Sequence, residues 1–135
     1  MSTAVATNPK PRLLVIDDEP LVISMLTRLL RRRYDLTTTT SGIEGLRLAC
    51  EEPWDAILCD VMLPELSGPQ LLQRLEAEGR PVAAKVGFMT GGAFGSEASS
   101  FLDRLGRGGW LAKPFGLSEL EAFVERLVER PLGGS

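Results

Sequence analysis

The chain alternates short, wholly apolar runs with longer stretches in which apolar residues recur every three or four positions. A short apolar run bounded by polar or turn residues is typical of a strand buried on both faces, whereas the longer period is typical of a helix with one buried side. The pattern predicts strands at residues 12–17, 55–60, 84–90 and 109–112, and the β-branched residues of 34–40 predict a further short strand. It predicts helices at residues 20–33, 43–52, 69–78, 96–105 and 117–130.

Residue types mark several of these helix ends. Pro20 stands where the first turn of a helix tolerates proline, and the arginines at 31–33 favour the carboxyl end of that helix. Gly79 closes the third helix. The residues of the first two helices that we expect to be available for burial are Leu21, Ile23, Met25, Leu26, Leu29, Leu30, Ile43, Leu46, Ala49 and Cys50.

Five strand–helix alternations in a chain of 135 residues predict one α/β domain, a doubly wound five-stranded parallel sheet with right-handed crossovers and helices on both faces. We place this domain at residues 12–131. Residues 1–11 are small, polar and proline-containing, which indicates a disordered leader or linker, and residues 132–135 are expected to form a flexible tail.

Composition excludes several kinds of site. The chain has no histidine, so histidine metal sites and histidine catalysis are excluded, and its two cysteines lack the spacing of a zinc site or disulfide framework. The net charge of −3 and a single short basic cluster at 31–33 argue against direct nucleic-acid binding. No run approaches the roughly 18 apolar residues of a membrane span, and residues 1–12 lack the apolar core of a signal peptide. We therefore expect a cytoplasmic protein that does not enter the membrane.

Carboxylates follow two of the predicted strands. Asp17 and Asp18 end the first strand, and Asp60 ends the third. Because parallel strands end at the same edge of a sheet, where open α/β sheets bind ligands, these three side chains are expected to lie close together. Carboxylates at such short separations repel one another unless a cation lies between them. Magnesium is a cation that carboxylates bind. Asp60 is our candidate for the reacting residue.

Four segments together resemble the receiver domain of bacterial two-component response regulators. The segments are Ile16-Asp17-Asp18-Glu19-Pro20, Leu58-Cys59-Asp60-Val61-Met62-Leu63-Pro64, Phe88-Met89-Thr90-Gly91 and Ala112-Lys113-Pro114-Phe115. The resemblance covers residues 12–130 and implies a flavodoxin-like (βα)5 sheet with strand order 2-1-3-4-5. The stretch from Phe88 to Phe94 also resembles the receiver modules of hybrid sensor histidine kinases.

The resemblance implies a role for each site residue. Asp60 is the phosphoacceptor, and Mg²⁺ is bound directly by Asp18 and Asp60, through water by Asp17, and by the backbone carbonyl of Met62. Lys113 and Thr90 contact phosphoryl oxygens, with Trp110 at the position of an aromatic switch. Gly91 and Pro114 belong to the loops that support the site.

The chemistry also follows from the residue types alone. An aspartate can act as a nucleophile that accepts a phosphoryl group, and such transfer depends mainly on positioning and on neutralising charge. A lysine supplies a compact positive charge and a threonine hydroxyl can donate a hydrogen bond. Taken singly, Asp60 could be a turn cap, Thr90 a strand end and Lys113 a solvated loop residue. Their combination favours the functional interpretation.

The expected partner is a sensor histidine kinase or a histidine phosphotransfer protein, and the resemblance also allows a homodimer through the fourth helix, fifth strand and last helix. Enzymatic activity would be limited to self-phosphorylation and slow autodephosphorylation. Two positions depart from the family: the side chain of Met62 cannot donate a hydrogen bond to an attacking water, and Trp110 is larger than the usual Tyr or Phe. These departures leave open a pseudo-receiver that binds partners without phosphorylation. A phosphatase of the haloacid dehalogenase type is a weaker alternative, because that family requires an acid where Met62 stands.

Overall fold

The sheet is built from five parallel strands whose order is β2-β1-β3-β4-β5. The computed structural model describes residues 9–91, 96–106 and 109–133. Its strands are β1 (Arg12–Ile16), β2 (Asp35–Thr39), β3 (Ala56–Asp60), β4 (Val86–Thr90) and β5 (Trp110–Ala112). The predicted doubly wound, flavodoxin-like α/β fold is confirmed. Of the predicted terminal segments, residues 1–8 and 134–135 lie outside the described ranges, as do residues 92–94 of the Phe88–Phe94 stretch.

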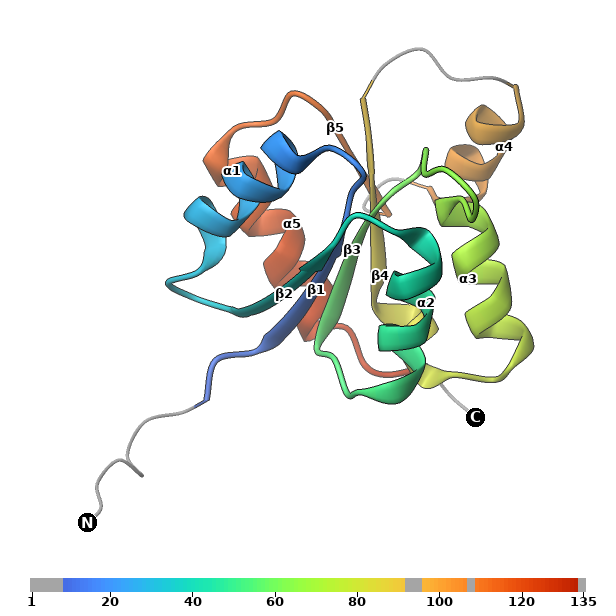
Figure 1. Cartoon of the computed structure of the whole chain (residues 1–135), viewed down its shortest axis with the longest axis horizontal. Coiled ribbons are helices and arrows are strands. Elements are labelled where there is room, and N and C mark those ends of the chain that lie inside the picture. Colours follow the sequence, from blue (N-terminus) through green and yellow to red (C-terminus); the bar gives the residue numbers. More distant parts are fainter. Residues whose placement is uncertain (1–8, 92–95, 107–108, 134–135) are drawn as a thin grey trace.

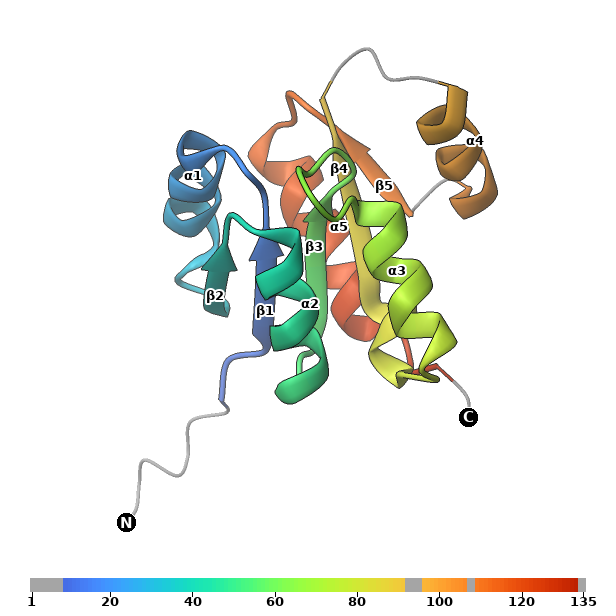
Figure 2. The same ribbon diagram turned by 45° about the vertical axis from the view of Figure 1, so that its right-hand side comes forward.

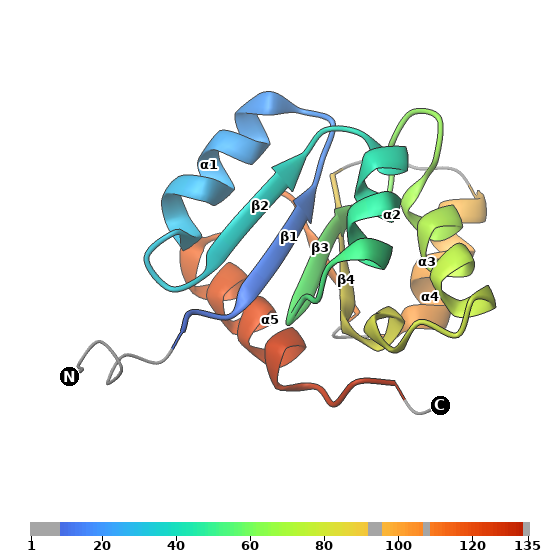
Figure 3. The same cartoon turned by 60° about the horizontal axis from the view of Figure 1, so that its bottom comes forward.

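Helices cover both faces of this sheet, as Figures 1 and 3 show. Helices α1 and α5 lie against one face, and α2, α3 and α4 lie against the other. Their bounds are α1 (Pro20–Leu30), α2 (Gly42–Glu51), α3 (Gly68–Ala77), α4 (Ser96–Leu105) and α5 (Leu117–Glu129), and a 3-10 helix, η2 (Pro81–Lys85), precedes β4.

Each face of the sheet has its own hydrophobic core. On the α1 and α5 face, Leu13, Val15 and Leu58 pack with residues of both helices. On the opposite face, Leu14, Ile57 and Phe88 pack against α2, α3 and α4. Because successive strand residues point to opposite faces, the wholly apolar strands supply both cores at once. This accounts for the uninterrupted apolar runs in the sequence.

Register and strand direction bring the carboxyl ends of the strands to one edge. Ile16 pairs with Cys59, Asp60 with Met89, and Thr90 with Ala112. Figure 2 shows the strand arrows pointing to this edge, which lies opposite the start of β1 and the end of α5. Residues that follow the strands therefore meet at one end of the molecule.

Two predicted boundaries are wrong by more than one residue. Helix α1 ends at Leu30 instead of Arg33, because the buried Tyr34 returns the chain to the sheet immediately afterwards. Ala84 and Lys85 belong to η2 and not to β4, since Pro81 begins a short helical turn that replaces the first residues of the predicted strand.

Three residues that we expected to be available for burial are exposed. Leu21 is 84% exposed, Met25 36% and Ile43 56%. A helix that covers a sheet buries only one side, and in α1 this side is occupied by Leu26 and Leu30. The three apolar residues therefore face solvent.

Lys85 lies at the other end of the sheet and is almost fully buried, with 5% exposure. Its ammonium donates hydrogen bonds to the carbonyl oxygens of Val128 (2.7 Å) and Arg130 (2.6 Å) at the end of α5. The amide of Gly133 donates to the carbonyl of Pro81 in η2 at 3.0 Å. The end of α5 and the residues after it are thereby attached to η2.

Among the helices of the described ranges, none has both the length and the apolar character needed to cross a bilayer.

Candidate functional site

Asp17, Asp18 and Asp60 form a cluster at the carboxyl edge of the sheet. One carboxylate oxygen of each lies within 4.8 Å of those of the other two. Asp17 is fully buried and Asp60 is 5% exposed, whereas Asp18 is exposed. The sequence placed these residues together because they follow adjacent strands, and the structure brings them together as predicted.

Backbone amides orient the two buried carboxylates. The amide of Glu19 donates to Oδ1 of Asp17 at 2.9 Å, and the amide of Met62 donates to Oδ1 of Asp60 at 3.2 Å. Each carboxylate is thus held by the turn that follows its own strand. Burial, reinforced by the negative charge of Asp17, raises the pKa of Asp60 above its usual value.

Lys113 is the cation of this cluster in the structure. Its Nζ lies 2.8 Å from Oδ2 of Asp17, 3.4 Å from Oδ2 of Asp60 and 3.7 Å from Oε1 of Glu19. Burial lowers the pKa of Lys113, but hydrogen bonding to Asp17 and the charges of Asp60 and Asp17 outweigh this effect and raise the pKa overall. Lys113 is therefore charged at neutral pH.

Thr90 ends β4 and directly follows Met89, the residue that pairs with Asp60. Thr90 is 3% exposed, and its Oγ1 has no hydrogen-bond partner within the described part of the chain. Its backbone carbonyl accepts a hydrogen bond of 2.7 Å from the amide of Lys113, which joins the ends of β4 and β5. A buried hydroxyl without a partner is costly, so this group is available for an acceptor that enters the site.

The remaining predicted site residues lie at different distances from the cluster. Gly91 lies against Lys113, since a Cβ at position 91 would be 3.1 Å from Cδ of Lys113. Pro114 follows Lys113 and is exposed. Met62 is 58% exposed and reaches the site only through its backbone. Trp110 pairs with Phe88 at the start of β5 and packs against the core on the α4 side.

Glu19 is a site residue to which sequence reasoning assigned no role. Its amide fixes Asp17 and its carboxylate faces Lys113. The available indication was its place directly after the acidic pair, at the start of a helix. That position alone does not show that a side chain turns back toward a lysine 94 residues later.

The cluster has the chemistry that a hard divalent cation requires. Magnesium prefers oxygen ligands and is usually held by one or two carboxylates with several waters. Here three carboxylates converge, and the Lys113 ammonium lies close to two of them, Asp17 and Asp60. The residues present therefore fit Mg²⁺.

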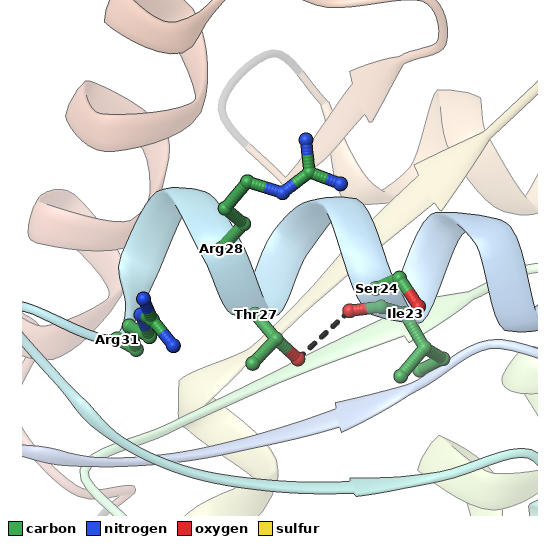
Figure 4. Close-up of a pocket in the computed structure, with 5 residues that line it drawn as sticks. All are labelled: Ile23, Ser24, Thr27, Arg28 and Arg31. Carbon is green, nitrogen blue, oxygen red and sulfur yellow. Dashed lines mark hydrogen bonds between the residues drawn. The ribbon is translucent and has the colours of Figure 1, made fainter.

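A depression lies along α1, apart from the carboxylate cluster. It has a volume of about 430 Å³ and is lined by Ile23, Ser24, Thr27, Arg28 and Arg31 (Figure 4). Thr27 donates to the carbonyl of Ile23 at 2.8 Å, so its hydroxyl is occupied within the helix. None of the carboxylate-cluster residues lines this depression, which is separate from the site.

Comparison with known sequences gives consistent results. Residues 13–125 match the sequence model of the response regulator receiver domain. The chain is 38% identical over 124 residues to the transcriptional activator protein PfeR of Pseudomonas aeruginosa, covering 90% of this chain and 39% of PfeR. It is 36% identical over 136 residues to the transcriptional regulatory protein PrrA of Mycobacterium tuberculosis, covering 96% of this chain and 54% of PrrA. The chain thus spans about two fifths to a half of the length of these curated relatives.

Solved structures are similar over nearly the whole chain. A response regulator receiver domain protein from Clostridium thermocellum has a TM-score of 0.75 and 28% identity, with 89% of this chain and 95% of that chain covered. The receiver domain of the sensor histidine kinase PA1611 from Pseudomonas aeruginosa has a TM-score of 0.73 and 26% identity, with 90% and 99% covered. The latter structure holds a magnesium ion coordinated in its active-site cleft.

Proposed function

The chain belongs to the response regulator receiver domain family, and from that premise we propose that it accepts a phosphoryl group on Asp60 and passes this state to a partner protein. The observation that supports the proposal best is one arrangement of three groups. The buried Asp60 carboxylate, a member of the cluster with Asp17, lies 3.4 Å from the Lys113 ammonium. The Thr90 hydroxyl, which has no hydrogen-bond partner among the described residues, is at the end of the next strand.

In the proposed step, a carboxylate oxygen of Asp60 forms a bond to the phosphorus of a phosphohistidine on a sensor kinase or phosphotransfer protein. The bond between phosphorus and the imidazole nitrogen breaks, and its electron pair remains on that nitrogen. The product is an acyl phosphate on Asp60, which water later cleaves to inorganic phosphate and the free carboxylate. Asp60 is suited to this role because it is held by the Met62 amide at the end of a rigid strand.

Lys113 and Thr90 would stabilise the phosphorylated state. The Lys113 ammonium already lies within 3.4 Å of Asp60 and can pair with a phosphoryl oxygen. The Thr90 hydroxyl would gain an acceptor for its hydrogen, and this gain would draw the end of β4 toward Asp60. Asp17, Asp18, Asp60 and the Met62 carbonyl would hold Mg²⁺. When bound, this ion supplies positive charge to the phosphoryl oxygens.

Exposed apolar side chains near the site support a protein partner. Leu21 is the second residue of α1, shortly after the acidic pair, and is 84% exposed. Leu117 begins α5, four residues after Lys113, and is 46% exposed. Met62, two residues after Asp60, is 58% exposed. Apolar groups around a charged site are suited to contact with a protein surface. A kinase partner of this kind carries its phosphoryl group in the cytoplasm, so the proposal places this chain there.

The proposal is tested by incubating the protein with phosphoramidate and magnesium and measuring its intact mass under mild conditions. We expect a gain of one phosphoryl group in the wild type and none in Asp60→Asn. Asp35→Asn, which changes an exposed aspartate at the other end of the sheet, is the matched control and should be labelled like the wild type. If neither phosphoramidate nor a purified kinase labels the wild type, the chain is a pseudo-receiver.

A further inference from the structure

The loop between β3 and α3 has an unusually constrained backbone. The amide of Leu66 donates to the carbonyl of Pro64 at 2.6 Å across Glu65, whose φ is 66°. This is a γ-turn with a positive φ at a residue other than glycine, which is a strained conformation. The amide of Gly68 closes the base of the loop by donating to the carbonyl of Val61 at 3.0 Å. Met62 lies in this loop, between Val61 at its base and the turn at Pro64 to Leu66.

The start of α2 contacts this loop more closely than any side chain would permit. A Cβ at position 42 would lie 2.2 Å from the carbonyl oxygen of Leu66 and 3.3 Å from its Cβ. Gly42 is the first residue of α2 and is buried, and the Oγ of Ser41 caps this helix by accepting a hydrogen bond of 3.1 Å from the Glu44 amide. The helix start and the turn are therefore in direct backbone contact.

We infer that Gly42 is a positioning residue for the phosphoacceptor site, and that it acts by bracing the loop that holds Met62. A methyl group at position 42 would push the Leu66 carbonyl by roughly 1 Å, because the contacting atom belongs to the backbone. The loop is closed at its base and strained at its turn, so it cannot absorb the shift locally. The displacement reaches Met62, whose amide orients Asp60.

The expected effects on magnesium binding and labelling rest on the proposed function, whereas the contact between Gly42 and Leu66 does not. The amide of Met62 donates to Asp60, and its carbonyl would bind Mg²⁺. A shift of the Met62 backbone would therefore disturb both interactions. Displacements of about 1 Å in groups that position a reacting centre reduce rates up to a hundredfold. Gly42→Ala should therefore weaken magnesium binding about tenfold or more, and slow labelling by phosphoramidate.

The variant is informative because alanine is otherwise acceptable at this position. The φ of Gly42 does not lie in the left-handed region, and alanine is a better helix former than glycine. Any defect in magnesium affinity must then come from the contact with Leu66. Gly87→Ala is the control for overpacking elsewhere in the sheet, since its Cβ would lie 2.5 Å from Cδ1 of Leu127 in the opposite core, away from the loop.

The experiment measures the magnesium dissociation constant by calorimetry and the amide chemical shift of Met62 by NMR without metal. We expect Gly42→Ala to show weaker binding and a shifted Met62 amide, and Gly87→Ala to resemble the wild type in both. Ser41→Ala, which removes the helix cap without adding an atom at the contact, should give a smaller change in the same direction. If Gly42→Ala does not fold, the same two measurements on Ser41→Ala test the inference.

Two outcomes overturn the inference. One is an unchanged Met62 amide and an unchanged dissociation constant in Gly42→Ala. The other is equal weakening in Gly87→Ala, which would mean that general destabilisation explains the loss. If the wild type itself neither binds magnesium nor is labelled, the proposed function fails, while the metal-free shift of the Met62 amide still decides whether Gly42 braces the loop.

Discussion

Lys113 and Asp17, 96 residues apart in the sequence, form an ion pair of 2.8 Å between the loop after β5 and the end of β1. The same ammonium lies 3.4 Å from Asp60. One cation therefore compensates two buried carboxylates on neighbouring strands. Removing it would leave both carboxylates without their counter-charge, which is the costly way to break a buried ion pair.

Lys113→Met should lower the free energy of unfolding of the metal-free protein by about 2 kcal/mol. The effect should depend on pH. Because the pKa of Lys113 is raised in the folded state, its stabilisation is fully present below the ordinary lysine pKa of 10.5 and is lost as the pH rises through the higher folded value. Urea unfolding at pH 7 and pH 11 measures both effects, with Lys10→Met as the exposed control. Equal stability of Lys113→Met and wild type at pH 7 would contradict the prediction.

Asp60→Asn should stabilise the metal-free protein while it abolishes labelling. The pKa of Asp60 is raised by burial and by Asp17, so its carboxylate destabilises the folded state. In the wild type, the free energy of unfolding falls as the pH rises from the ordinary value of 3.8 through the raised one. The variant lacks this contribution and should be more stable than the wild type at pH 7. Thermal melting without metal would show a lower Tm for Asp60→Asn if this reasoning is wrong.

Thr90→Val should also stabilise the unphosphorylated protein. Valine matches the shape of threonine and removes a buried hydroxyl that lacks a partner among the described residues. We expect a gain of about 1 kcal/mol, or a rise in Tm of roughly 4 °C. Phosphoramidate labelling of Asp60 should persist, since the hydroxyl is not the nucleophile. A fall in Tm would indicate that the hydroxyl already has a stabilising partner.

Trp110 should report the phosphorylated state by fluorescence. The second tryptophan, Trp54, lies before β3 at the opposite end of the sheet, where its Nε1 donates to the carbonyl of Leu48 at 2.8 Å. Trp54→Phe therefore leaves one indole, on the strand that pairs with β4. Movement of Thr90 toward Asp60 should shift the emission of Trp110 when beryllofluoride and magnesium are added. The double variant Trp54→Phe, Asp60→Asn should show no shift. If Trp54→Phe alone also shows no shift, the switching surface lies elsewhere.

The fold and the carboxylate cluster were predictable because both follow from strand patterns. Apolar runs such as Leu13–Ile16 can only be buried on both faces, which requires helices on both sides of a parallel sheet. Asp17 and Asp60 then fall at the same edge, because parallel strands end together. For these residues, position along the chain determines position in space.

Other features depend on tertiary contacts, which the spacing of apolar residues along the chain cannot show. Leu21 and Ile43 fit an apolar helical pattern yet are exposed, because the sheet covers only one side of each helix. Glu19 turns back to Lys113, and Gly42 contacts a loop carbonyl, through approaches between segments far apart in the sequence. Lys85 was assigned to a strand, whereas it ends a 3-10 turn and is buried.

The two carbonyls that receive the Lys85 ammonium belong to the last turn of α5 and the residue after it. That end of the helix is consequently a fixed pivot, while the other end begins at Leu117, just after the loop that carries Lys113. A helix of 13 residues is about 20 Å long, so a tilt of about 5° around the pivot moves its free end by about 2 Å. Any displacement of Lys113 that tilts α5 is therefore greatest beside the site and vanishes at the opposite end of the molecule.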